Sequence, residues 1–174
     1  MSSKERPIDV ISVLVVDDHP IFRFGVCERI KLIGERVVLA GEAGNGAEAL
    51  SLVGKLNPSV ILMDLNMPNM TGIEATRKIK EEFPDIQIII LSAEDELSDV
   101  NSALQAGASG YLLKSASAIE IQEAIFTVHG GGSSLSPMVA RQLLTNLTRP
   151  TSTAEVAHRA GTSNSQDGVN WHNQ

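Results

Sequence analysis

Short runs of aliphatic and β-branched residues alternate with helix-like patterns from about residue 10 to residue 146 of this chain. Such continuous apolar runs are typical of strands that are buried on both faces, as in parallel sheets. The runs predict five strands, at residues 11–16, 37–43, 60–63, 86–92 and 111–113. Their alternation with helices indicates βαβ units, and therefore an α/β domain built on a parallel sheet.

Apolar residues between these strands recur at helical spacing. They occupy positions 22, 26, 30 and 33 after the first strand, and positions 121, 124, 125 and 128 after the fifth. Each series lies on one face of a helix, which we expect to pack against the sheet. Ser117 with Glu120 three residues later predicts a capped helix start, and Gly130 after His129 predicts the end of that helix.

The remainder of the chain changes character. A further helix is expected at 137–146, with Val139, Leu143 and Leu147 on one face. From residue 148 to residue 174 apolar residues are sparse and Ser, Thr, Asn and Gly are frequent, which predicts a polar, mobile tail. A short helix at 154–159 is the alternative for part of this tail.

The composition limits what the chain can do. A length of 174 residues with 43% hydrophobic content suits one compact domain and a modest appendage. The net charge of -7 argues against a DNA-binding surface, which would show a basic stripe. Cys27 is the only cysteine, which excludes an intrachain disulfide and a cysteine-based zinc cluster. No run approaches the roughly 20 apolar residues of a membrane span, and the start lacks a secretory signal, so we expect a cytoplasmic protein that does not contact membranes.

Three carboxylates follow two of the predicted strands. Asp17 and Asp18 come directly after the first strand, and Asp64 comes directly after the third. In an open parallel sheet, ligands bind beyond the carboxyl ends of the strands, where the connections change direction. Carboxylates that converge there repel one another unless a proton or cation intervenes, and an oxygen-only cluster suits hydrated Mg²⁺. A turn or a helix cap explains any one of these aspartates equally well, but two strand ends that share the feature favour a site.

Two further polar residues end neighbouring strands. Ser92 ends the fourth strand with a hydroxyl, and Lys114 follows the fifth with a cation. Taken by itself, Lys114 would be interpreted as a surface lysine. Together with the aspartates, these residues supply an acceptor carboxylate, metal ligands, a hydroxyl and an ammonium, the groups that stabilise a transferred phosphoryl group.

Four motifs resemble those of the receiver domain of bacterial two-component response regulators. They read VVDDHP at 15–20, MDLNMP at 63–68 with Gly72 following, LSA at 91–93, and GASGYLLK at 107–114. The match covers about residues 10–130, so we predict a receiver domain at 10–130, a linker with an extra helix at 131–147, and the tail at 148–174. The resemblance implies the CheY-like fold, a doubly wound, five-stranded parallel sheet of order 2-1-3-4-5 with helices on both faces.

The resemblance also implies roles for matching residues at the first and third strands. Asp64 corresponds to the phospho-acceptor. Asp17 and Asp18 correspond to the acidic pair that holds Mg²⁺ together with the acceptor, and Asn66 to the residue whose backbone carbonyl completes the coordination.

The remaining matches imply a switch. Ser92 and Lys114 correspond to the pair that contacts the phosphoryl group, and Tyr111 to an aromatic residue that moves when the hydroxyl residue moves. We hypothesise that phosphorylation draws Ser92 toward Asp64, lets Tyr111 turn inward and favours a homodimer. A histidine kinase is the expected partner. We expect the domain to accept and slowly lose its phosphoryl group without acting as an enzyme on other substrates.

The DDHP motif and the stretch 130–140 resemble response regulators of the NarL/LuxR type, in which a four-helix DNA-binding domain follows. About 25 residues follow Arg149, too few for such a unit, so we expect no DNA binding by this chain alone. Two functions stay open: a receiver that switches protein contacts, and the regulatory portion of a truncated LuxR-type transcription regulator. A Mg²⁺-dependent phosphatase on a similar sheet is a third alternative, but it requires substrate-binding insertions and the loops are short.

Overall fold

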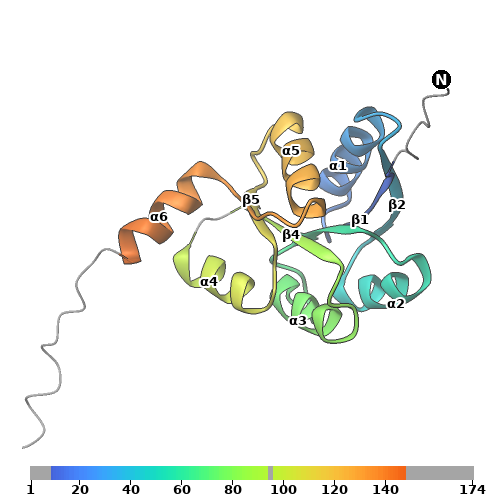
Figure 1. Ribbon diagram of the computed structural model, residues 1–174. Coiled ribbons are helices and arrows are strands. Elements are labelled where there is room, and N and C mark those ends of the chain that lie inside the picture. The colour runs from blue at the N-terminus through green and yellow to red at the C-terminus, as the bar shows by residue number, and fades with distance from the viewer. Residues whose placement is uncertain (1–8, 94–95, 148–174) are drawn as a thin grey trace, which may run out of the picture.

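The sheet is parallel throughout and contains the five predicted strands. The computed structural model describes residues 9–93 and 96–147, the last two by their backbone only. The predicted strands are β1 (Ile11–Val16), β2 (Val37–Ala43), β3 (Val60–Asp64), β4 (Gln87–Ser92) and β5 (Gly110–Leu113). They are arranged in the order β2-β1-β3-β4-β5, which confirms the predicted fold class (Figure 1).

Helices cover both faces of this sheet. In Figure 1, α1 (Pro20–Leu32) and α5 (Ala118–His129) lie on one face, and α2 (Gly46–Leu56), α3 (Gly72–Glu82) and α4 (Leu97–Gln105) lie on the other. Each face has its own apolar core, and strand residues alternate between them. In β1, Leu14 packs into the core under α2 and α3, whereas Val13 packs into the core under α1 and α5. Burial on both faces explains why the central strands are continuous apolar runs.

The chain returns to the sheet after α5, which was not predicted. A sixth strand, β6 (Ser134–Leu135), pairs in parallel with β5. A Cβ at Gly110 would lie 2.8 Å from the carbonyl oxygen of Ser134, so glycine permits this close pairing. The helix expected at 137–146 is present as α6 (Pro137–Leu147), and it packs beside α4 (Figure 1).

Helix ends follow the predicted signals in most places. Ser117 and Glu120 form a capping box at the start of α5, and Gly130 is its C-cap residue. Ile33, expected on the first helix, is instead the C-cap residue that follows α1. The tail at 148–174 and its alternative helix lie outside the described residues, and the division of the chain at residue 130 stays a prediction. No helix within 9–93 or 96–147 is long and apolar enough to cross a membrane.

Candidate functional site

The acidic residues gather at the carboxyl edge of the sheet. Asp17 and Asp18 follow β1 directly, whereas Asp64 is the last residue of β3 rather than the residue after it. The two strands are neighbours, so their ends lie side by side. Asp17 and Asp64 are only 1% and 2% exposed, and Asp18 is half-buried. One oxygen of each carboxylate and one ring nitrogen of His19 all lie within 4.8 Å of one another.

The loop after β3 folds tightly against Asp64 because residue 72 is glycine. The N–H of Gly72 donates to the carbonyl oxygen of Leu65 at 2.8 Å. A Cβ at position 72 would overlap the carbonyl oxygen of Asp64. Thr71 and Glu74 form a capping box that starts α3 at this point. The intervening loop contains Asn66, which is exposed two residues after Asp64.

Lys114 bridges the two most buried carboxylates. It follows β5, and its Nζ lies 2.7 Å from Asp17 Oδ2 and 3.0 Å from Asp64 Oδ1. The ammonium also lies 4.7 Å from the centre of the Phe22 ring, within the range of a cation–π interaction. Burial acts to lower the pKa of Lys114, but its hydrogen bonds to Asp17 and Asp64 outweigh that effect and raise the pKa. The lysine therefore stays charged between these carboxylates.

Asp64 keeps one oxygen free of protein donors. Burial raises the pKa of Asp64 to about 6, although the hydrogen bond from Lys114 opposes this shift. The carboxylate is thus largely ionised at neutral pH. Its Oδ1 pairs with Lys114, whereas its buried Oδ2 meets no hydrogen-bond donor within the described part of the chain. A buried carboxylate oxygen without a donor, next to two other carboxylates, fits a divalent cation.

His19 belongs to the site, and the sequence reasoning missed it. Its Nδ1 lies 2.8 Å from Asp18 Oδ1 and 3.4 Å from Asp17 Oδ1. Its backbone N–H donates to Asp17 Oδ1 at 2.7 Å. Its sequence position could have revealed it, because His19 follows the first strand directly after Asp17 and Asp18.

Ser92 reaches the same edge of the sheet, but Tyr111 does not. Ser92 is the buried last residue of β4, and its carbonyl oxygen accepts the N–H of Lys114 at 2.7 Å. Tyr111 is fully buried in the core that also contains Val100 of α4 and Val139 of α6. The switching hypothesis has Tyr111 turn inward after phosphorylation. In this structure the side chain is already buried, in a core that includes Leu135 of β6 and Val139 of α6, so its movement stays a prediction.

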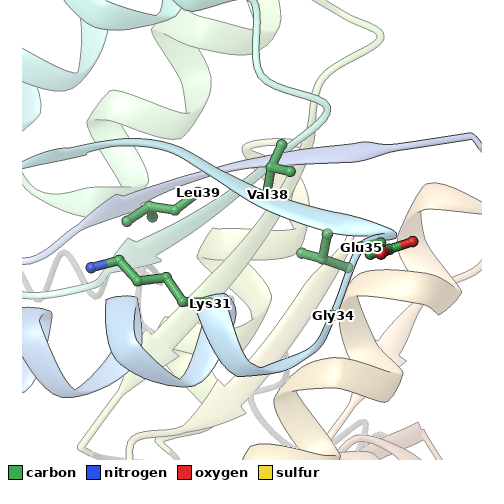
Figure 2. A pocket seen from close by; sticks show the side chains of 6 residues that line it. Lys31, Gly34, Glu35, Val38 and Leu39 are labelled. Carbon is green, nitrogen blue, oxygen red and sulfur yellow. The ribbon is translucent and has the colours of Figure 1, made fainter.

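Two surface hollows help to delimit the site. One of about 470 Å³ opens beside Asp18, between the start of α2 and the loop around Pro68. The other, of about 530 Å³, lies between the end of α1 and the edge strand β2 (Figure 2). Lys31, Val38 and Leu39 lie at its walls, and it does not adjoin the acidic cluster. The first hollow therefore adjoins the acidic cluster at Asp18.

Comparison with known proteins gives a consistent result. The family model "Response regulator receiver domain" matches residues 13–126. The chain is 41% identical over 134 residues to the transcriptional regulatory protein DegU of Brevibacillus brevis, covering 77% of this chain and 56% of that protein. It is 40% identical over 134 residues to the response regulator GacA of Pseudomonas aeruginosa, covering 77% of this chain and 62% of that protein. The chain thus spans less than two thirds of the length of these relatives.

Two solved structures are similar over nearly their whole length. One is a LuxR-family two-component response regulator from Aurantimonas sp., with a TM-score of 0.74, 32% identity, and coverage of 80% of this chain and 99% of that chain. The other is the signal receiver domain of a NarL response regulator from Mycobacterium tuberculosis, with a TM-score of 0.68, 38% identity, and coverage of 71% and 98%. The similarity therefore includes both the fold and the segments that carry the acidic cluster.

Proposed function

Because the chain belongs to the family of response regulator receiver domains, we propose that it is a signalling switch that accepts a phosphoryl group on Asp64. The observation that carries the proposal is the state of the Asp64 carboxylate. It is buried, one oxygen is paired with Lys114, and the other meets no protein donor among the described residues. A carboxylate held in this way is positioned to act as a nucleophile. The reaction also requires a phosphodonor and a cation that neutralises the phosphoryl oxygens.

Several groups around Asp64 support the transfer. Asp17, Asp18 and Asp64, with the backbone carbonyl of Asn66, are the proposed ligands of Mg²⁺, which would supply positive charge to the phosphoryl oxygens. In the proposed reaction, an Asp64 oxygen forms a bond to phosphorus as the bond from phosphorus to the donor breaks. Lys114, whose ammonium lies 3.0 Å from Asp64 Oδ1, would neutralise part of the charge of the new acyl phosphate.

Ser92 would act next to this group. Its hydroxyl lies at the end of β4, beside the end of β3, and can donate to a phosphoryl oxygen once it is drawn toward Asp64. Movement of Ser92 would alter the packing between β4 and α4, where Tyr111 is enclosed. We propose that Tyr111 responds to this movement by repacking within the core in which it is already buried.

The proposed partners follow from the chemistry. The phosphodonor is a histidine kinase, in whose phosphohistidine the bond from phosphorus to nitrogen is broken, and the domain catalyses no reaction on another substrate. We propose a homodimer of the phosphorylated form as the output in the cytoplasm, tightened by about 1 to 3 kcal/mol of coupling. Sedimentation of the parent and of Ser92→Ala, with and without phosphodonor, tests this; an unchanged monomer fraction in the phosphorylated parent contradicts it.

A second output has support from the relatives. DegU is named a transcriptional regulatory protein, and the chain covers 56% of its length. The alternative is therefore that this receiver forms the regulatory portion of a LuxR-type transcription regulator. We still expect no sequence-specific DNA binding by the 174 residues themselves, which a mobility-shift assay at physiological salt would check.

The experiment for the phosphorylation itself uses acetyl phosphate with Mg²⁺ and intact-mass measurement. The parent should gain one phosphoryl group, and Asp64→Asn should gain none. Asp85→Asn is the matched control, because Asp85 is exposed in the loop before β4 and should not affect the reaction. Equal modification of the parent and Asp64→Asn would contradict the proposal.

A further inference from the structure

The imidazole of His19 faces the same carboxylate oxygens that the proposed cation would use. Its Nδ1 lies 2.8 Å from Asp18 Oδ1, 3.4 Å from Asp17 Oδ1 and 4.0 Å from Asp64 Oδ2. These are three different carboxylates, and each presents one oxygen toward the ring. His19 is therefore placed centrally among the acidic residues, and not at the edge of a single ion pair.

Lys114 and His19 divide the buried carboxylates between them. Lys114 takes Asp17 Oδ2 and Asp64 Oδ1, and His19 faces the opposite oxygens, Asp17 Oδ1 and Asp64 Oδ2. On the lysine side the negative charge already has a permanent partner. On the histidine side, Asp64 Oδ2 is buried and has no hydrogen-bond donor from residues 9–93 or 96–147. Asp18 Oδ1, which also faces His19, accepts no hydrogen bond either within these residues, so the oxygens on the histidine side are the ones available to a cation.

The local backbone holds His19 in this position. His19 is the N-cap residue of α1, yet its side chain makes no capping hydrogen bond, and Pro20 at the first helical position restricts the chain. Its N–H is anchored on Asp17 Oδ1. The side chain is nevertheless 69% exposed, so the ring can adjust its position without displacing packed residues.

The distances suit ligands of one ion. Nitrogen and oxygen ligands lie about 2.0 to 2.2 Å from Zn²⁺, so two of them at the tetrahedral angle are about 3.3 to 3.6 Å apart. The three distances from His19 Nδ1 to the aspartate oxygens, 2.8, 3.4 and 4.0 Å, lie on either side of this separation, and all four ligand atoms lie within 4.8 Å of one another. Small movements of the side chains would complete a shared coordination sphere.

We propose that His19 Nδ1 is a ligand that gives this site a preference for a first-row transition cation, such as Zn²⁺, over Mg²⁺. The inference deepens the proposed function, since it concerns the cation of the same site. Mg²⁺ takes oxygen ligands and retains several waters, whereas an imidazole suits transition metals, whose affinity for mixed nitrogen and oxygen sites is higher. His19 is thus a determinant of cation selectivity.

The test is calorimetric titration of Zn²⁺ and of Mg²⁺ into the full chain and two variants. The parent should bind Zn²⁺ more tightly than Mg²⁺. His19→Ala should weaken Zn²⁺ binding by about tenfold or more, and Mg²⁺ binding by less than about threefold. His129→Ala is the matched control, because His129 pairs with Asp9 at the opposite edge of the sheet and should leave both affinities as in the parent.

A second readout reports the bond directly. With ¹⁵N-labelled histidine, the Nδ1 resonance of His19 should shift on addition of Zn²⁺ but not of Mg²⁺, and its assignment comes from its loss in His19→Ala. Equal effects of His19→Ala on both cations, or none on either, would show that His19 is only a charge partner of Asp18. Loss of Zn²⁺ binding in His129→Ala would place the zinc elsewhere and also overturn the proposal.

The outcome is separable from that of the proposed function. If the parent is phosphorylated on Asp64 with Mg²⁺ but His19→Ala retains the cation preference, only the selectivity proposal fails. If His19 governs zinc binding but Asp64 accepts no phosphoryl group, the receiver function fails and the selectivity proposal holds.

Discussion

At the scale of single residues, the burial of Asp64 disfavours the ionised form of its carboxylate in the folded protein. Its pKa is raised to about 6 mainly by burial, so the folded protein holds the proton more tightly than the unfolded chain does. The stability that comes from protonation is fully present below the unfolded pKa, near 4, and is lost as the pH rises through about 6. Ionised Asp64 therefore lowers the free energy of unfolding at neutral pH.

Asp64→Asn should accordingly stabilise the protein at high pH in buffer without divalent cations. We expect the free energy of unfolding to rise by roughly 1 to 2 kcal/mol at pH 8, after allowance for the lost ion pair with Lys114, and not to rise at pH 4. Urea denaturation at the two pH values measures the difference. The same change in the free energy of unfolding at pH 4 and pH 8 would show that ionisation of Asp64 does not destabilise the folded protein.

Gly72→Ala should disturb the site through its backbone. The added Cβ would overlap the carbonyl oxygen of Asp64, so the loop must move, at a cost of about 2 kcal/mol or more of unfolding free energy. Gly54→Ala is the matched control. Gly54 is exposed within α2 with nothing nearer than 3.9 Å to its Cβ position, so alanine there should stabilise by up to about 1 kcal/mol. Similar stabilities of the two variants would contradict the tight loop.

The sequence predicted those site residues whose position depends only on strand ends. Asp17, Asp64 and Lys114 are of this kind, because parallel strands bring their carboxyl ends to one edge. His19 was missed because its role depends on the orientation of its side chain toward the aspartates, which its position after the strand does not determine. The cover over Tyr111 could not be predicted either, because it comes from a segment more than twenty residues later in the chain, Ser134 to Val139.

At the scale of elements, β6 and α6 extend the domain beyond the five-stranded sheet. Five strands and their helices could be predicted because each carries its own periodic apolar pattern. β6 has only two residues, Ser134 and Leu135, which are too few for any period, and its pairing depends on the close approach that Gly110 permits. The helix α6 was expected, but its packing beside α4 could not be deduced from its own sequence.

Val139→Ala should show that α6 is an integral part of the fold. Val139 is fully buried in the core that contains Tyr111, so losing its two methyl groups should reduce the free energy of unfolding by about 1.5 to 3 kcal/mol. Met138→Ala, at a neighbouring position that is exposed, should change it by less than about 0.5 kcal/mol. Equal effects in chemical denaturation would indicate that α6 does not pack on the domain.

At the scale of the whole molecule, net charge and cation binding act together. The chain carries a formal charge of -7, and three of its carboxylates meet at one edge of the sheet. A cation that binds only the folded state stabilises it by mass action, by about 2.7 kcal/mol when the free ion exceeds its dissociation constant a hundredfold. The proposed site thus links stability to Mg²⁺ concentration.

Millimolar Mg²⁺ should therefore raise the melting temperature of the parent. A gain of 2.7 kcal/mol corresponds to a rise of roughly 5 to 10 °C for a domain of this size. Asp18→Asn should reduce the rise, because it removes one of the proposed ligands. Sodium chloride at equal ionic strength is the control for general screening. A rise that sodium chloride reproduces, or that persists in full in Asp18→Asn, would contradict the cation site.

The most direct test of the central claim is the chemical location of the phosphoryl group. After reaction with acetyl phosphate and Mg²⁺, sodium borohydride reduces an aspartyl phosphate to homoserine, and peptide mass spectrometry locates the converted residue. The account predicts homoserine at position 64, and at no other aspartate, in the treated parent alone. Conversion at Asp17 or Asp18, or no conversion in a sample that has gained phosphoryl mass, would contradict it.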